Sequence, residues 1–252
     1  FGALCAYTIN TPYNYGVKEV VFLSFLLCSG AHWRMMKRIH QTLKEGKGGH
    51  NYFIVASSSR VNLNTVDNSG VIRAVSNHAV IGIERMLILP SLSYLCAGLW
   101  GAFLVSGLTY IVWRLGRDGE GKGSSSLAFV VLKLLSVVTT PLTSILLLCA
   151  CIFVPFANIA RAIKGGIKSS LGYEQGGVAL TMVAYALNMI LGGPSKDIDG
   201  WVIKRSWVGP EKISANMDVD MVKRVKYLHF IVTVLWGFCL VGMLLAYKIS
   251  FL

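Results

Sequence analysis

Residues 86–113 read MLILPSLSYLCAGLWGAFLVSGLTYIVW, 28 consecutive positions without a charged side chain. This run exceeds the roughly 20 apolar residues that an α-helix needs to cross the hydrocarbon core of a bilayer. Its small residues include Gly98 and Ala102, which lie four positions apart and would let a second helix approach closely. Tyr110 and Trp113 end the run with the aromatic pair that is common at membrane interfaces. The stretch predicts a transmembrane helix.

Two further stretches, residues 127–156 and 227–252, are also long and apolar enough to span. The first contains Lys133, Pro141 and Pro155. Prolines are tolerated in membrane helices because neighbouring groups can satisfy the freed carbonyls, so we expect kinks near both. Lys133 lies about two turns into the stretch, where its charged end can reach the interface. Both stretches predict transmembrane helices.

Two shorter apolar runs complete the pattern. Residues 177–191 are marginal in length for a crossing, but a thin bilayer or oligomeric packing would allow one. The run near residues 18–33 is too short to span and predicts an interfacial helix that lies on the membrane. The sequence therefore predicts an all-α protein, a polytopic transmembrane bundle of about four spans with a short interfacial N-terminal helix.

The composition agrees with this class. Hydrophobic residues make up 54% of the chain and charged residues 14%, whereas soluble domains average about 25% charged residues. The polar segments divide the chain into a polar and basic N-terminal segment (1–85), a three-span core (86–192), an amphipathic surface segment (193–226) and a C-terminal transmembrane helix (227–252).

The chain is strongly basic, with 24 Lys and Arg against 12 Asp and Glu and a formal net charge of +12. Basic residues beside membrane spans bind anionic lipid head groups and set topology, so we expect phospholipid as a partner and no nucleic acid. The candidate head-group ligands are Arg114 and Arg117 after the first span and Lys164 and Lys168 before the third.

Motifs of soluble enzymes are missing from the sequence. It has no Walker loop, no H-E-x-x-H motif and no nucleophile elbow, and its six cysteines form no C-x-x-C pair. The acidic residues all lie outside the central parts of the predicted spans, which argues against an ion-coupled transporter. We expect no catalytic residue and no metal site. His78 precedes the first span and His229 opens the last, where each can form an interfacial hydrogen bond or belong to a binding site.

Three short motifs resemble, in order, those of one membrane-protein family. Ser76-Asn77-His78-Ala79-Val80-Ile81-Gly82-Ile83 resembles the S-x-x-H-R-x-T-G-[IVL] signature that opens the cytochrome-b-type membrane anchor subunit of succinate dehydrogenase. Residues 158–163 (NIARAI) are similar to its N-G-I-R-H-L motif at the end of the second span. Residues 173–178 (YEQGGV) are similar to the Y-Q-S-G-V opening of its third span.

The resemblance implies a small helical anchor in the mitochondrial inner membrane that holds soluble redox subunits and contributes to a ubiquinone site. By this analogy Ser76 and His78 would lie near the quinone head group, while Gly82, Asn158 and Arg161 would be structural.

Three departures from the family pattern bear on this analogy. The position of the quinone-site arginine holds Ala79, the serine is shifted by one residue, and the position of the haem-ligating histidine holds Pro155. We therefore expect no haem ligand from the second span.

The leading functional hypothesis is a non-catalytic membrane-anchor subunit of a mitochondrial respiratory complex, of the succinate dehydrogenase type, with other subunits, ubiquinone and phospholipid such as cardiolipin as partners. One alternative is a lineage-specific structural accessory subunit of complex I or the ATP synthase. A second is an oligomeric pore or transporter with Lys133 lining its path.

Overall fold

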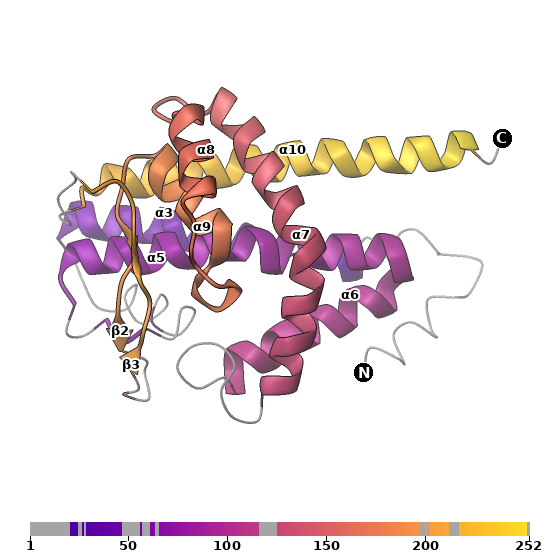
Figure 1. The fold of residues 1–252 in the computed structure, drawn as a ribbon, viewed down its shortest axis with the longest axis horizontal. Coiled ribbons are helices and arrows are strands. Elements are labelled where there is room, and N and C mark those ends of the chain that lie inside the picture. Colours follow the sequence, from indigo (N-terminus) through magenta and orange to yellow (C-terminus); the bar gives the residue numbers. More distant parts are fainter. Residues whose placement is uncertain are drawn as a thin grey trace.

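A computed structural model describes residues 21–24, 27, 29–46, 56, 61–63, 66–115, 125–196, 200, 202–211 and 217–250. Most of this chain is helical, which confirms the all-α class (Figure 1). Its helices are α3 (Ser29–Glu45), α5 (Asn68–Gly82), the π-helix η1 (Ile83–Ile88), α6 (Leu89–Leu115), α7 (Ser126–Phe153), α8 (Ile159–Ile167), the 3₁₀ turn η2 (Tyr173–Gln175), α9 (Gly177–Ala186) and α10 (Asp220–Ser250). Its strands are β1 (Leu191–Gly192), β2 (Ser195–Lys196), β3 (Val202–Ile203) and β4 (Trp207–Val208).

The first predicted span is a helical hairpin. α5, η1 and the first part of α6 run on as one helical rod until the backbone leaves helical geometry at Ala97 and Gly98. Arg85 and Trp113 line one cleft, although a straight helix would hold them about 42 Å apart. Figure 1 shows the chain turning back within α6. The prediction of a single helix over residues 86–113 is therefore wrong.

Gly98 makes this reversal possible. Its φ of 63° and ψ of −158° lie in a region that is almost exclusive to glycine. A Cβ at Gly98 would meet nothing within 4 Å, so glycine is used here for its backbone freedom. The predicted close-approach face of Gly98 and Ala102 is therefore not formed at Gly98.

α7 follows its prediction more closely. It continues through Pro141 as one α-helix and ends at Phe153, so the expected kink at Pro141 is not a break in the helix. Near Pro155 the chain turns, because Val154 is extended and Phe156 has a φ of 77°. Phe156 then lies 5.0 Å from the guanidinium of Arg224 in the first turns of α10.

The third predicted span, residues 177–191, is not formed as a crossing. α9 has ten residues, which give a length of about 15 Å, half of the hydrocarbon thickness. Its side chains are largely buried and it packs against α8. Among the described residues, three helical stretches are long and apolar enough to span by length and composition: Asn68–Leu115, which contains the reversal at Gly98, Ser126–Phe153 and Asp220–Met243. They are compatible with an integral membrane protein.

The hydrophobic core begins before residue 86. α5 lies within the segment that the sequence assigns to polar residues, yet Val71, Ile72 and Val75 are fully buried. α3 covers α5 and α10 with Met36 and Ile39 and extends well beyond the short helix expected near residues 18–33. α5 is therefore part of the hydrophobic core, although the charge pattern predicts that this segment is exposed to solvent.

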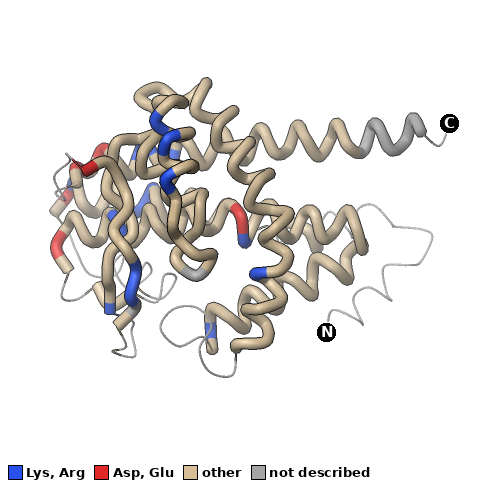
Figure 2. The backbone as a smooth tube through the Cα atoms, viewed as in Figure 1, with Lys and Arg blue, Asp and Glu red and all other residues tan. Residues whose placement is uncertain are grey.

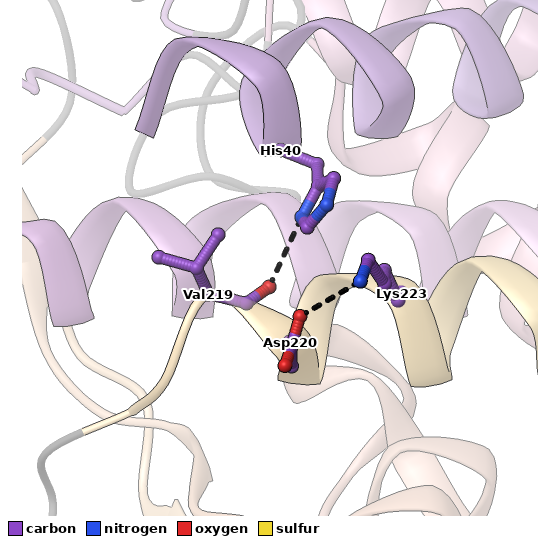
Figure 3. A network of polar contacts seen from close by, with 4 residues as sticks. All are labelled: His40, Val219, Asp220 and Lys223. Atoms are coloured by element: carbon purple, nitrogen blue, oxygen red, sulfur yellow. Dashed lines mark hydrogen bonds and ion pairs between the residues drawn. The ribbon is translucent and has the colours of Figure 1, made fainter. Parts of the chain in front are cut away.

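α3 also meets the start of α10 through polar groups. His40 Nδ1 of α3 lies 3.3 Å from the carbonyl oxygen of Val219, the residue before α10 (Figure 3). Within α10 itself, Lys223 Nζ lies 3.0 Å from Asp220 Oδ1. α10 begins at Asp220, seven residues before the predicted span.

The four strands form a short two-part ribbon that begins two residues before the predicted surface segment (193–226). β1 pairs with β4 and β2 with β3, both antiparallel. Gly193, with a φ of 80°, lies against Trp207, where a Cβ would approach the indole ring to 2.8 Å. Figure 2 shows charged residues gathered at the end that carries α3, α8 and this ribbon, while most of α6 and the described outer part of α10 are uncharged.

Candidate functional site

Three histidines that are far apart in the sequence meet where α3, α5 and α10 pack against one another. We call His32 of α3, His78 of α5 and His229 of α10 the histidine cluster. The ring centroids of His32 and His78 are 4.9 Å apart and stacked, and those of His32 and His229 are 5.7 Å apart. His32 and His229 are 3% and 2% exposed.

Gly82 allows α3 to come this close. It lies one turn after His78 on α5, and a Cβ at this position would overlap the His32 ring. The family resemblance gives Gly82 a structural role, and the contact with His32 provides a physical reason for a glycine here.

The geometry of the cluster favours hydrogen bonding and ring stacking over metal binding. Stacked imidazoles present their faces to one another, whereas metal ligands must direct nitrogen lone pairs at one point. Among the described residues, no group of three or more His, Cys, Asp or Glu is arranged to hold a metal ion. Imidazole can both donate and accept hydrogen bonds, so the cluster can bind a neutral polar head group.

The two predicted quinone residues are placed differently. His78 belongs to the cluster, while Ser76, two positions earlier, lies on another face of α5 because residues i and i+2 of a helix diverge. Ser76 is fully buried, and its hydroxyl has no hydrogen-bond partner among the described residues. The structure therefore joins His78 to His32 and His229, which the motif comparison had left out.

Asn77 attaches the ribbon to α5. Its Nδ2 donates to the carbonyl of Gly192 at 3.3 Å, and the Gly192 N–H donates to Asn77 Oδ1 at 3.0 Å. Next to this contact, the guanidinium of Arg73 lies 4.4 Å from the centre of the Trp207 ring. These contacts fix the ribbon beside the helix that carries His78.

A carboxylate is buried against the middle of α7. Glu84 is 5% exposed, and its Oε1 accepts hydrogen bonds from the hydroxyls of Thr139 at 2.8 Å and Thr140 at 2.7 Å. It lies in η1, and π-helical turns are frequent at functional sites. Glu84 does lie outside the central parts of the predicted spans, two residues before 86–113, but its side chain packs against the middle of α7. The adjacent threonines in the middle of an apolar stretch were the sequence signal for a buried polar partner.

Ser91 forms a second polar contact deeper among the apolar helices. The indole Nε1 of Trp236 donates to Ser91 Oγ at 2.7 Å, and Ser91 Oγ itself donates to the carbonyl of Leu87 at 2.6 Å. This contact ties α6 to α10 less than one turn beyond η1.

The hairpin of α6 encloses a small cleft. Its volume is about 160 Å³, and its walls come from both legs of the hairpin: Arg85, Met86, Pro90, Ser106, Thr109, Tyr110 and Trp113. The Arg85 guanidinium donates to the carbonyl of Tyr173 at 2.5 Å and lies 4.2 Å from the centre of its ring. Arg85 thereby links the hairpin to the turn before α9.

The residues matched in the second motif form the start of α8. Asn158 is its N-cap, and the side-chain oxygen accepts a hydrogen bond from the N–H of Arg161 at 3.0 Å. Arg161 Nη1 donates to Asn188 Oδ1 at 2.9 Å. Lys164 and Lys168 are exposed on the same helix.

The other predicted cations lie apart from this helix. Arg114 is exposed at the end of α6, and Arg117 lies outside the described residues. Lys133 is exposed on the outer surface of α7, which is the position expected for a side chain that extends to the interface.

No protein-family model, curated protein or solved structure matches this chain.

Proposed function

We propose that this protein is a helical membrane-anchor subunit that binds the head group of a quinone-like amphiphile at its histidine cluster and holds soluble partner subunits at its charged end. The observation that carries the proposal is the convergence of His32, His78 and His229 from three separate helices.

The chemistry of the cluster fits such a ligand. The carbonyl oxygens of a quinone accept hydrogen bonds, and imidazole N–H groups are suitable donors. The apolar tail of the ligand would extend along α6 and α10, whose outer surfaces expose Trp100, Leu104 and Phe238. The polar head of such a ligand thus matches the histidine cluster, and its apolar tail matches the exposed apolar surfaces of α6 and α10.

The finer proposal is an anchor of the succinate dehydrogenase type in the mitochondrial inner membrane. The order of the three motifs supports it, together with the position of His78 in the cluster. Mild detergent extraction should then recover the chain with a flavoprotein and an iron–sulfur subunit. Recovery with subunits of complex I or the ATP synthase would instead favour the structural accessory role.

Ligand binding can be tested on the purified protein in lipid nanodiscs. We expect a short-chain ubiquinone to bind, and His78→Leu, which removes the N–H donor, to weaken binding by about tenfold, the equivalent of one hydrogen bond to a buried group. His40→Leu is the matched control, because His40 lies on α3 outside the cluster. Equal binding by wild type and His78→Leu would contradict the proposed site.

The buried Glu84 favours one second candidate, an ion or proton pathway. Ionisable residues within apolar membrane helices are commonly functional, and Glu84 is held by two threonines of α7. Flux in liposomes that is lost in Glu84→Gln would support this alternative. The exposed position of Lys133 gives it no support as a pore-lining residue.

A further inference from the structure

α8 presents three different faces. Ala162 and Gly165 are buried, and a Cβ on Gly165 would come within 2.9 Å of the Thr181 carbonyl oxygen on α9. A second face carries three exposed isoleucines, Ile159, Ile163 and Ile167, the last of them 82% exposed. The third face carries the exposed cations Arg161, Lys164 and Lys168.

An exposed apolar stripe beside a basic stripe is the pattern of a helix in the plane of the membrane interface. The isoleucines can enter the boundary of the acyl chains, while the long basic side chains reach the head groups. α8 follows directly after α7, one of the three helices long enough to span. The chain therefore places α8 beside the lipid.

The basic face of α8 also forms one wall of a cleft of about 330 Å³. The lining residues are Arg161, Lys164, Lys168, Tyr185, Asn188, Pro210 and Glu211. Three cations face one carboxylate, so the lining has a net positive charge. A cleft of this kind attracts an anion more strongly than a flat basic surface does, because its walls focus the field.

Asn188 holds one of these cations in place. Its side-chain oxygen accepts from Arg161 Nη1 at 2.9 Å, and its backbone has a φ of 57°, which is uncommon for a residue other than glycine. The guanidinium is therefore oriented before any ligand arrives. An oriented arginine is well suited to a phosphate group, which it can bind through two N–H donors.

We infer that this cleft binds the head-group phosphate of an anionic phospholipid, with Arg161 as the fixed ligand and Lys164 and Lys168 as mobile ones. The isoleucine stripe favours a lipid over a soluble phosphate compound, since it would lie among the acyl chains of the same leaflet. The inference is independent of the histidine cluster and gives Arg161 a ligand-binding role besides its structural one.

The test uses the full-length protein in a neutral detergent, titrated with dioleoyl phosphatidylglycerol and, separately, with dioleoyl phosphatidylcholine, while bound lipid is measured by native mass spectrometry. We expect the anionic lipid to bind preferentially. Lys164→Gln/Lys168→Gln should weaken it about 30-fold, because each cation near anionic lipid contributes about fivefold.

Lys196→Gln/Lys204→Gln is the control, since it removes the same charge from exposed lysines outside the cleft. Asn188→Gly, which keeps the positive φ but releases Arg161, should weaken binding a few-fold. An equal loss in the control would overturn the inference in favour of non-specific attraction. Displacement of the lipid by inorganic phosphate at similar concentrations would overturn the lipid as the ligand.

Discussion

Residues 86–113 and 126–153 are two apolar stretches of equal length, 28 residues each, and they fold differently. The second is one helix that continues through Pro141, whereas the first reverses direction at Gly98. The sequence alone suggests the opposite, because proline is the usual cause of a break and an isolated glycine is tolerated in membrane helices. Apolar length identifies a membrane segment, but one backbone position decides whether the chain crosses or returns.

The largest expected effect concerns the side of the membrane on which the two ends of the hairpin lie. A straight helix would place the end of α6 opposite α3, while a hairpin returns it to the same side. Single cysteines at Glu45 and Leu115, both exposed, should therefore react with a membrane-impermeant maleimide from the same side.

Cys96, which is exposed beside the turn, should not react from that side. From Arg85 to Cys96 the first leg is about 17 Å long, about half the thickness of the hydrocarbon core, so with Arg85 at the interface the turn lies within the core. Labelling of Glu45→Cys and Leu115→Cys from opposite sides would show that residues 86–113 cross the membrane once. These residues would then form a single crossing helix, as α7 does.

The second prediction concerns the backbone at the turn. Gly98→Ala forces a Cβ into a conformation that residues other than glycine rarely adopt, and we expect a loss of about 2 kcal/mol of stability. Gly107→Ala is the matched control, because Gly107 lies in the helical part of α6 and a Cβ there also meets nothing within 4 Å.

Alanine at Gly107 should stabilise α6 by about 0.5 to 1 kcal/mol through its higher helix propensity. Thermal unfolding in detergent compares the two variants directly. If both substitutions have the same effect, Gly98 does not supply the turn.

The third prediction tests where the two stretches meet. Glu84→Leu leaves the buried hydroxyl of Thr139 and that of Thr140 without their shared acceptor, which should cost about 1 to 2 kcal/mol. Glu84→Gln retains a side-chain oxygen that can accept both bonds, so it should cost less. Equal unfolding temperatures for Glu84→Leu and wild type would show that this contact does not hold the hairpin against α7.

The comparison also shows how much of the fold can be predicted. The all-α class and the limits of α7 follow from local apolarity, since the predicted stretch 127–156 nearly matches Ser126–Phe153. The turn at Gly98 cannot be predicted from local apolarity, because the sequence of an apolar run is the same whether the helix continues or reverses. α9 shows the same difficulty, since its apolar side chains are buried in protein rather than in lipid.

The site was harder to predict than the fold. His78 was found through a motif, but its neighbours His32 and His229 lie far away in the sequence, and only the packing of α3 and α10 on α5 brings them together. Glu84 precedes the predicted span by two residues, and its burial depends on α7 crossing η1 at that point.

The smallest expected effect concerns the charged end, where pH should act on the α3–α10 contact and leave the hairpin and α7 unchanged. Burial lowers the pKa of His40 below its ordinary value of 6.5; the Val219 carbonyl opposes this shift, while Lys223, Lys44 and Lys226 add to it. As the pH falls through 6.5, His40 therefore binds a proton in the unfolded chain before it does so in the folded protein. Protonation of the unfolded chain lowers the free energy of unfolding, so the protein is most stable above pH 6.5 and loses stability as the pH falls toward the lower pKa of folded His40. His40→Gln should flatten that part of the profile of unfolding temperature against pH, and an unchanged profile would contradict the assignment.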